Sequence, residues 1–179
     1  EKQEEDTSAD GNETEEHSTL GAAVRQITPD TEYKRAVVLH NEKKYNEAVA
    51  VEKELIRQEP ENTRYYRLLW QTLYAMGELG KAEETARKLI GLESGNAGFY
   101  IDLSVILRKR GKDAEAAAEA EKAIGLDPQN ARCHASLGRT LHKMGRDKEA
   151  KEALETAVRL APENDFYKED LEEVLQKLK

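Results

Sequence analysis

Residues 131–164 read ARCHASLGRTLHKMGRDKEAKEALETAVRLAPEN, and this stretch carries the pattern of two amphipathic helices. The first apolar stripe consists of His134, Leu137 and Leu141. The second stripe follows Gly145 and consists of Ala150, Leu154, Ala157 and Leu160. Intervals of three and four residues place such side chains on one face of a helix. Glycine tolerates the positive φ of a helix C-terminus, so Gly145 marks the turn of a predicted helix-turn-helix.

The same pattern recurs along the chain with a period of 34 residues. The repeated positions include Asn62, Asn96, Asn130 and Asn164, then Ala48, Ala82, Ala116 and Ala150, then Leu39, Leu73, Leu107 and Leu141. Four units follow, over residues 29–62, 63–96, 97–130 and 131–164. The asparagines precede the predicted helices, where a short acceptor side chain can satisfy free backbone N–H groups. Thr28 has this place before the first unit, and Pro29 follows it.

This sequence resembles the tetratricopeptide repeat. The last unit carries the family pattern at Leu137, Gly138, Leu141, Ala150, Ala157 and Pro162. The resemblance extends from about residue 29 to the C-terminus and implies an all-α fold, an α-solenoid that winds as a right-handed superhelix of four helix-turn-helix units. Residues 165–179 have Leu171, Val174 and Leu175 at helical spacing, and we expect a helix there that caps the last apolar surface. The predicted domain therefore covers residues 28–179.

Three residues depart from the pattern. Trp70 occupies a position at which the family has a small residue, because the two helices of a unit approach closely there. We expect either a core residue accommodated by the small Ala82 and Ala86, or an aromatic wall of a locally widened groove. In the first unit, Lys43 replaces the turn glycine and Glu52 interrupts the apolar stripe. These substitutions predict that the first unit is the least stable.

The N-terminal residues have a different composition. Residues 1–20 contain eight acidic side chains and one basic side chain, a net charge of −7, whereas the other 159 residues contain 27 basic and 28 acidic side chains. Residues 1–27 have few large apolar side chains and cannot offset the entropy cost of ordering. We interpret them as a disordered acidic tail. The tail is either a spacer or a functional acidic ligand segment.

The sequence contains no catalytic signature, and we predict neither an enzyme nor a bound cofactor or metal ion. His134 and His142 are eight residues apart, about 12 Å along a helix, too far to share one ion. Cys133 is the single cysteine and has no disulfide partner. No apolar run reaches the roughly 18 residues of a membrane span. Because the sequence begins with Glu1, the compartment stays open: a soluble protein of the cytoplasm, or of the periplasm or another extracytoplasmic space if a signal or anchor has been removed.

The resemblance implies that a partner binds the concave face, which the first helix of each unit forms. The predicted binding residues are Tyr33, Arg64, Arg67, Gln71, Tyr74, Ile101, Val105, Arg108, Lys109, Arg132, Arg139, His142 and Lys143. Seven of the twenty residues at the family's contact positions are Arg or Lys and one is acidic, whereas about three basic residues would be expected from the chain as a whole. A solvated charged face is one explanation. A concave basic surface also focuses its potential, and guanidinium groups bind carboxylates through two hydrogen bonds.

We therefore predict a non-enzymatic interaction module or scaffold whose basic groove binds an acidic protein or peptide segment. Nucleic acid is a less favourable partner, because the folded part is nearly neutral and the tail would repel phosphates. The alternative is a self-assembling scaffold, a homo-oligomer in which the acidic tail or a neighbouring subunit occupies the groove.

Overall fold

The computed structural model describes residues 28–179, and within this range the chain forms nine helices and no strand. The helices are α1 (Pro29–Asn41), α2 (Tyr45–Gln58), α3 (Thr63–Ala75), α4 (Leu79–Leu92), α5 (Ala97–Lys109), α6 (Asp113–Leu126), α7 (Ala131–Lys143), α8 (Asp147–Leu160) and α9 (Asp165–Lys177). The predicted all-α solenoid is confirmed. The predicted acidic tail, residues 1–27, lies outside the described residues. None of these helices is long and apolar enough to cross a membrane.

Asparagine side chains begin α3, α5, α7 and α9, as the sequence predicted. The Oδ1 atoms of Asn62, Asn96, Asn130 and Asn164 each accept a hydrogen bond of 3.1 Å from the backbone N–H two residues later. Thr28 begins α1 with a reciprocal capping box to Thr31. These side chains satisfy donors that have no partner inside the helix. The repeat of asparagine every 34 residues therefore fixes where α3, α5, α7 and α9 start.

The turns after the odd-numbered helices require a left-handed residue. Gly77 and Gly111 have φ of 77° and Gly145 has φ of 74°. Lys43 occupies the same place after α1 with φ of 61°, and it is the one non-glycine residue with positive φ in the described part of the chain. A side chain with a Cβ atom is disfavoured in this conformation by about 1 kcal/mol or more. The first turn is thus held in a less favourable backbone state than the other three.

We expect the substitution Lys43→Gly to raise the free energy of unfolding by about 0.5–1 kcal/mol, because it removes the Cβ atom from a left-handed position. Urea unfolding followed by circular dichroism measures the change. Lys43→Ala is the matched control: it removes the charge and keeps the Cβ atom, so it should bring no such gain. Equal effects of the two substitutions would show that the side-chain charge, and not the backbone conformation, limits stability at this turn.

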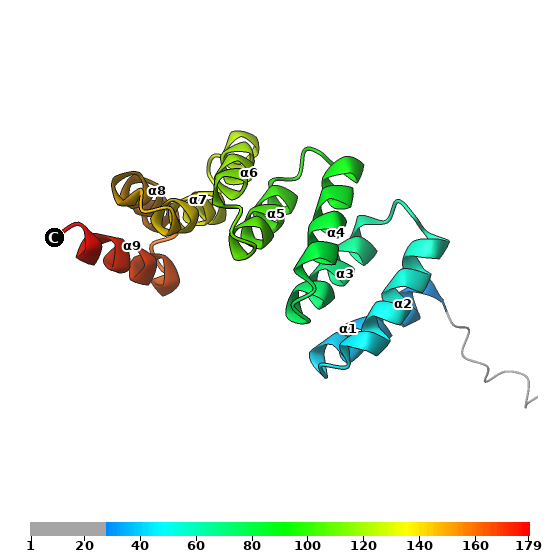
Figure 1. Cartoon of the computed structure of the whole chain (residues 1–179). Helices are drawn as coiled ribbons and strands as arrows, with labels where there is room; N and C mark the ends of the chain where they lie inside the picture. Colours follow the sequence, from blue (N-terminus) through cyan, green and yellow to red (C-terminus); the bar gives the residue numbers. More distant parts are fainter. Residues whose placement is uncertain (1–27) are drawn as a thin grey trace, which may run out of the picture.

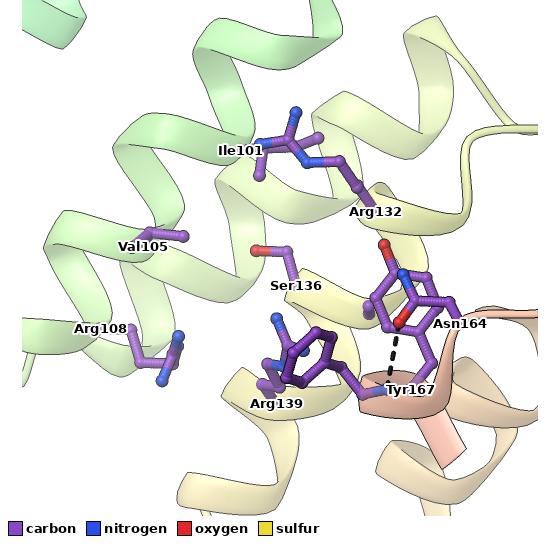
Figure 2. A pocket seen from close by; sticks show the side chains of 10 residues that line it. Ile101, Val105, Arg108, Arg132, Ser136, Arg139, Asn164 and Tyr167 are labelled. Carbon is purple, nitrogen blue, oxygen red and sulfur yellow. Dashed lines mark hydrogen bonds between the residues drawn. The ribbon is translucent and has the colours of Figure 1, made fainter. Parts of the chain in front are cut away.

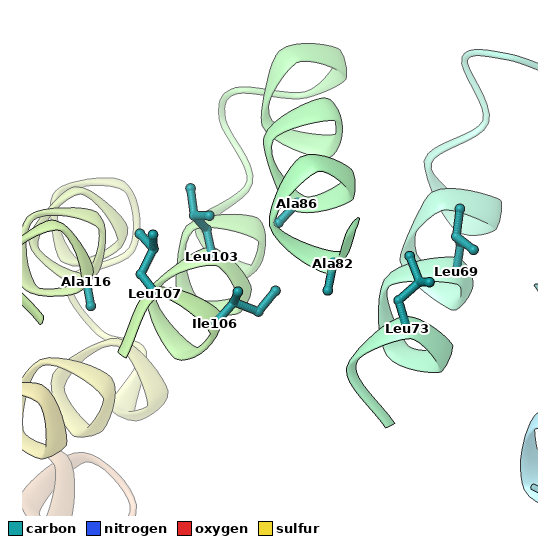
Figure 3. Close-up of a cluster of buried hydrophobic side chains, with 8 residues drawn as sticks. All are labelled: Leu69, Leu73, Ala82, Ala86, Leu103, Ile106, Leu107 and Ala116. Atoms are coloured by element: carbon teal, nitrogen blue, oxygen red, sulfur yellow. The ribbon is translucent and has the colours of Figure 1, made fainter. Parts of the chain in front are cut away.

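The helices follow one another along an elongated stack, with α1 and α9 at opposite ends (Figure 1). Each helix packs on the next, and the interior is a series of small apolar clusters. The central cluster joins α3, α4, α5 and α6 (Figure 3), and its buried members are Leu69, Leu73, Ala82, Ala86, Leu103, Ile106, Leu107 and Ala116. The helix pairs agree with the predicted helix-turn-helix pattern. The division into four units and a cap stays a prediction.

Helix α9 closes the stack at the C-terminal end. Tyr167 and Val174 are buried in one cluster with Leu154 of α8, while Phe166 is the most exposed large hydrophobic side chain of helices α1 to α9. A helix is therefore present where we expected a cap. Its first turn also extends toward the face formed by α5 and α7.

A buried carboxylate connects two helix pairs. The side chain of Glu83 in α4 is 4% exposed and forms ion pairs with Arg87, Arg110 and Lys112. Arg110 directly follows α5, and Lys112 directly precedes α6. A buried charge needs such partners, because desolvation would otherwise make it costly. This cluster holds α4 against α5 and α6 and leaves no unpaired charge on Glu83.

Candidate functional site

The odd-numbered helices line the inner face of the stack. Helix α1 contacts α3 directly, α5 contacts α7, and α7 contacts α9, whereas no two even-numbered helices of the described chain make contacts of this extent. Helices on the inner side of a curved stack come closer together than those outside, so the odd-numbered helices form the concave face. Helices α3 and α5 contact each other less than the other neighbouring odd-numbered helices do. The cavities described below fall into an N-terminal part of this face, on α1 and α3, and a C-terminal part, on α5, α7 and α9.

The N-terminal part is an open cavity of about 570 Å³ between α1 and α3, which we call the aromatic cavity. It is lined by Tyr33, Val37, His40, Asn41, Leu68, Trp70, Gln71, Tyr74 and Ala75. Basic side chains cover two of its rings: the guanidinium of Arg64 lies 4.5 Å from the centre of the Tyr33 ring, and Nζ of Lys109 lies 5.0 Å from that of Tyr74. Cations over rings gain electrostatic energy from the π face. This cavity offers apolar surface with a positive rim.

Trp70 has both of the roles that the sequence left open. Its side chain is half-buried and packs against the cluster that contains Ala82 and Ala86. It also lines the aromatic cavity and stacks on Tyr74 with 5.6 Å between ring centres and 17° between planes. Nε1 of the indole is buried, with no hydrogen-bond partner among the described residues. A residue this large at the close approach of two helices is tolerated because part of it extends into the groove.

A buried polar chain lies beneath the aromatic cavity. Nδ1 of His40 is 2.9 Å from Oγ1 of Thr72, which donates a hydrogen bond of 2.6 Å to Oε1 of Glu52. Glu52 is fully buried, and its Oε2 has no partner among residues 28–179. Burial raises the pKa of Glu52 to about 7, against the opposing effect of the Thr72 hydrogen bond. The sequence showed Glu52 as a polar interruption of an apolar stripe, but it did not show these partners.

The C-terminal part of the concave face contains a cavity of about 260 Å³ between α5, α7 and the start of α9, which we call the arginine pocket (Figure 2). It is lined by Ile101, Val105, Arg108, Arg132, Ala135, Ser136, Arg139, Asn164, Phe166 and Tyr167. Three of these side chains are guanidinium groups and none is a carboxylate. Val105 and Ser136 point toward each other across the pocket. An anionic group would therefore meet positive charge and apolar surface together.

A second cavity of about 300 Å³ shares Arg108 and Arg139 with the arginine pocket and differs from it in charge. Its other lining residues are His142, Lys143, Leu154, Asp170, Glu173 and Val174. Here the charges are balanced within the chain. Nε of Arg139 lies 2.6 Å from Asp170, the ring nitrogens of His142 lie 2.5 Å from Asp147 and 3.5 Å from Glu173, and Nζ of Lys143 lies 2.8 Å from Asp113. The excess positive charge thus faces the arginine pocket.

Of the three arginines that line the arginine pocket, Arg108 is the least neutralised. Among residues 28–179 no carboxylate lies within 4 Å of its guanidinium, and its Nε is buried without a hydrogen-bond acceptor. Burial, and then the charge of Arg139, lower the pKa of Arg108 below its usual value, although arginine stays charged in proteins. Within residues 28–179, Arg132 pairs with a single carboxylate, that of Asp102 at 3.9 Å. A buried donor without an acceptor costs free energy that an anionic ligand could recover.

The structure distributes the predicted binding residues between the two parts. Tyr33, Gln71 and Tyr74 line the aromatic cavity, with Arg64 and Lys109 on its rings. Ile101, Val105, Arg108, Arg132 and Arg139 line the arginine pocket, and His142 and Lys143 line the cavity beside it. Arg67 is exposed and lines neither cavity. The sequence predicts a basic groove with apolar patches, and the cavities on this face differ in the same way: aromatic side chains line the one between α1 and α3, and arginines line the one between α5, α7 and α9.

Sequence reasoning missed the contribution of α9. Asn164, Phe166, Tyr167 and Asp170 line these cavities, whereas the sequence pattern predicts only a cap over residues 165–179. The signal was available, because Phe166 stands at the same phase of the 34-residue period as Arg64 and Arg132. Applying the family's contact positions to the segment after the fourth unit identifies Phe166 as a contact residue. Asp102 and Asp170, the acidic partners of Arg132 and Arg139, do not occupy the family's contact positions. Their contacts with these arginines depend on how the helices pack.

Other reactive groups do not form a site in the described chain. Cys133 is buried, and burial raises the pKa of its thiol to about 11, so the thiol stays protonated and is a poor nucleophile. His134 is half-buried, and its Nε2 lies 2.9 Å from the carbonyl oxygen of Pro128. No three His, Cys, Asp or Glu side chains between residues 28 and 179 gather in a way that could hold a metal ion.

Comparisons with known proteins agree with the helical repeat. Two sequence models, both described as tetratricopeptide repeat, match residues 67–131 and 107–169. No curated protein sequence matches the chain at a significant level. Similar solved structures include a thermophilic tetratricopeptide repeat protein of Thermus thermophilus, with 21% identity over 84% of this chain and 83% of that chain and a TM-score of 0.70.

Two further structures have the same arrangement of helices. MamA from Desulfovibrio magneticus RS-1 is 19% identical over 83% of this chain and 89% of that chain, with a TM-score of 0.69. PilF of Pseudomonas aeruginosa is 20% identical over 83% of this chain and 68% of that chain, with a TM-score of 0.73. At such identities the likeness extends to the fold alone.

Proposed function

Because this chain belongs to the tetratricopeptide repeat family, we propose that it is a non-enzymatic interaction module whose concave face binds an acidic segment of a partner protein. The fold itself indicates a role in protein–protein interaction or as a scaffold. The chemistry of the partner follows from the concave face. A segment lying along the odd-numbered helices would meet the aromatic cavity at one end and the arginine pocket at the other.

The observation that carries this proposal is the charge of the arginine pocket. Three arginines line it without a carboxylate among its lining residues, and Arg108 has no acidic partner within 4 Å in residues 28–179. Many other charged side chains form ion pairs on the helix surface. Exposed pairs of that kind contribute little and need no ligand. Positive charge concentrated in a concavity raises the local concentration of anionic groups and fixes their orientation.

The aromatic cavity supports a longer ligand than the arginine pocket could hold alone. Tyr33, Trp70 and Tyr74 supply apolar rings, and such side chains dominate the energetics of protein interfaces. Lys109 of α5 reaches over Tyr74 of α3, so basic charge extends between the two sites. We propose that a partner with apolar residues at one end and acidic residues at the other occupies both.

A charge-reversal variant tests the proposal. The full chain is used to capture a partner from a lysate of its own organism, beside the triple variant Arg67→Glu, Arg108→Glu, Arg139→Glu. Once the partner is identified, we expect the triple variant to bind it at least about 30-fold more weakly, because it replaces attraction by repulsion on the concave face. Binding to the parent chain should also weaken with added salt.

The matched control reverses three basic residues away from the concave face: Lys53→Glu, Lys88→Glu and Arg159→Glu. These side chains are exposed on α2, α4 and α8. Circular dichroism of both variants checks that the helices persist. Equal losses in the two variants would mean that net charge, and not the concave face, governs binding. Capture of the chain itself alone would favour the self-assembly alternative.

A further inference from the structure

The size of the arginine pocket indicates what part of a partner it can hold. Its volume of about 260 Å³ is below the roughly 300–1,000 Å³ of pockets that enclose a whole small molecule. It opens between three helices, since its walls come from α5, α7 and α9 (Figure 2). A pocket of this size takes one or two side chains of a segment that continues outside it.

The charged wall favours a carboxylate. Arg108 of α5 and Arg139 of α7 both line the pocket, and burial, followed by the charge of Arg139, lowers the pKa of Arg108. Nε of Arg139 is already occupied by Asp170 in the neighbouring cavity, which leaves the outer nitrogens of this guanidinium for a second acceptor. A carboxylate between two guanidiniums can accept several parallel hydrogen bonds, and it removes their repulsion.

The rest of the lining is largely apolar and includes an exposed aromatic ring. Ile101 and Val105 lie on α5 with Arg108, Ala135 lies on α7 with Arg139, and Phe166 at the start of α9 is 71% exposed to solvent. Exposed aromatic side chains of this kind commonly act as anchors in protein interfaces. The backbone N–H of Phe166 donates to Asn164, so the first turn of α9 holds this residue at the rim. An apolar group beside the carboxylate would cover the ring.

We infer that the arginine pocket recognises a Glu or Asp side chain that has an apolar residue directly beside it, with the carboxylate between Arg108 and Arg139 and the apolar side chain on Phe166. This inference rests on the proposed function and makes it more specific. Because Asp170 and Glu173 lie on the other side of the two arginines, the carboxylate enters from the Phe166 side. Acidic residues alone, or apolar residues alone, should be poor ligands.

Short peptides blocked at both ends test this pairing. Four hexapeptides of glycine carry Glu-Leu, Gln-Leu, Glu-Ser or Gln-Ser at the two central positions. Binding to the full chain is measured by nuclear magnetic resonance, from the Nε–H signals of the arginines and the ring signals of Phe166. We expect Glu-Leu to bind about tenfold or more tightly than each of the other three. A fifth peptide ending in Gln-Leu with a free terminal carboxylate distinguishes a side chain from a chain terminus; binding of this peptide alone would overturn the side-chain assignment.

Two substitutions identify which residue of the pocket recognises the acidic side chain of the peptide and which recognises the apolar side chain beside it. Arg108→Gln should remove the preference for Glu-Leu over Gln-Leu, and Phe166→Ser should remove the preference for Glu-Leu over Glu-Ser. Arg108→Lys keeps the charge without the planar fork and should give an intermediate preference. Lys88→Gln, on the exposed face of α4, is the control and should change neither. Phe166 is so exposed that its replacement leaves the core intact.

The outcomes separate this inference from the proposed function. Equal weakening of all peptides by Arg108→Gln, or a preference of the parent chain for Gln-Leu, would overturn the inference. If the charge-reversal variant still loses its partner in that case, binding by the concave face stands with a different recognition element. If neither the peptides nor the partner respond to these changes, both proposals fail.

Discussion

The substitution Glu52→Gln should make the stability of this protein less dependent on pH. The free energy of unfolding of the variant, relative to that of the parent chain, should rise by about 3 kcal/mol between about pH 4 and pH 8. The reason is the fully buried carboxyl group of Glu52, which accepts a hydrogen bond from Thr72. Burial raises its pKa from 4.5 to about 7. One pKa unit corresponds to about 1.4 kcal/mol, which sets the size of the expected change.

The sign follows from the protons bound in each state. Below pH 4.5 Glu52 is protonated in both the folded and the unfolded chain, and its contribution to stability is fully present. Between pH 4.5 and about 7 the unfolded chain loses this proton while the folded chain keeps it, so the free energy of unfolding falls as the pH rises. Above about pH 7 both states are ionised and the loss is complete. Glutamine does not titrate and avoids this loss.

Urea unfolding at a series of pH values measures this difference, and hydrogen exchange of the amides in α1, α2 and α3 shows where it arises. Glu54→Gln is the matched control on the same helix. Glu54 is half-exposed, and Arg57, then Gln58, lower its pKa to about 2, so its substitution should change the pH dependence in the opposite direction. A parallel pH dependence of the Glu52 variant and the parent chain would show that Glu52 is ionised in the folded state at little cost.

The substitution Gly138→Val should lower the free energy of unfolding by about 3 kcal/mol. A Cβ atom added to Gly138 in α7 would lie 2.6 Å from Cγ of Leu154 and 3.2 Å from the carbonyl oxygen of Ala150 in α8. Leu154 and Ala150 are fully buried, so neither can move into solvent. Overpacking of a well-packed interior costs about 1–3 kcal/mol, and the branched side chain of valine adds further atoms at the contact. Helices α7 and α8 would have to separate.

The control uses a helical glycine without neighbours. No atom lies within 4 Å of a Cβ built on Gly91, which is exposed in α4. Gly91→Val should therefore change stability by less than about 0.5 kcal/mol, since valine is a somewhat better helix former than glycine. Thermal and urea unfolding compare the two variants. Similar losses in both would indicate a general effect of valine in these helices, and the close approach of α7 to α8 would not explain the result.

The position of a residue within the 34-residue repeat does not by itself determine which side chain is tolerated where two helices touch. Gly138, Ser104 and Trp70 share one position of the 34-residue period. At this position Gly138 lies against Leu154, the hydroxyl of Ser104 donates to the carbonyl of Ala116, and Trp70 extends into the aromatic cavity. Three side chains of very different volume are tolerated because each helix pair adjusts its own packing. The sequence identified Trp70 as exceptional but could not choose between its two roles.

The local features of this protein followed from its sequence. The asparagine caps, the left-handed glycines and the apolar stripes depend on residues close together in the chain, so a 34-residue period fixed the helices and their order. The period also indicated the face on which Tyr33, Arg108 and Arg139 lie.

Only the tertiary structure decided how the charges of that face are shared. Asp170 pairs with Arg139 across 31 positions of the chain, Glu52 meets His40 through Thr72, and Arg108 is left without a carboxylate partner in the described residues. Such contacts depend on the distances between helices that are far apart in the sequence. A repeat sets these distances only on average, and the packing of individual side chains, such as Trp70 between α3 and α4, sets them at each site.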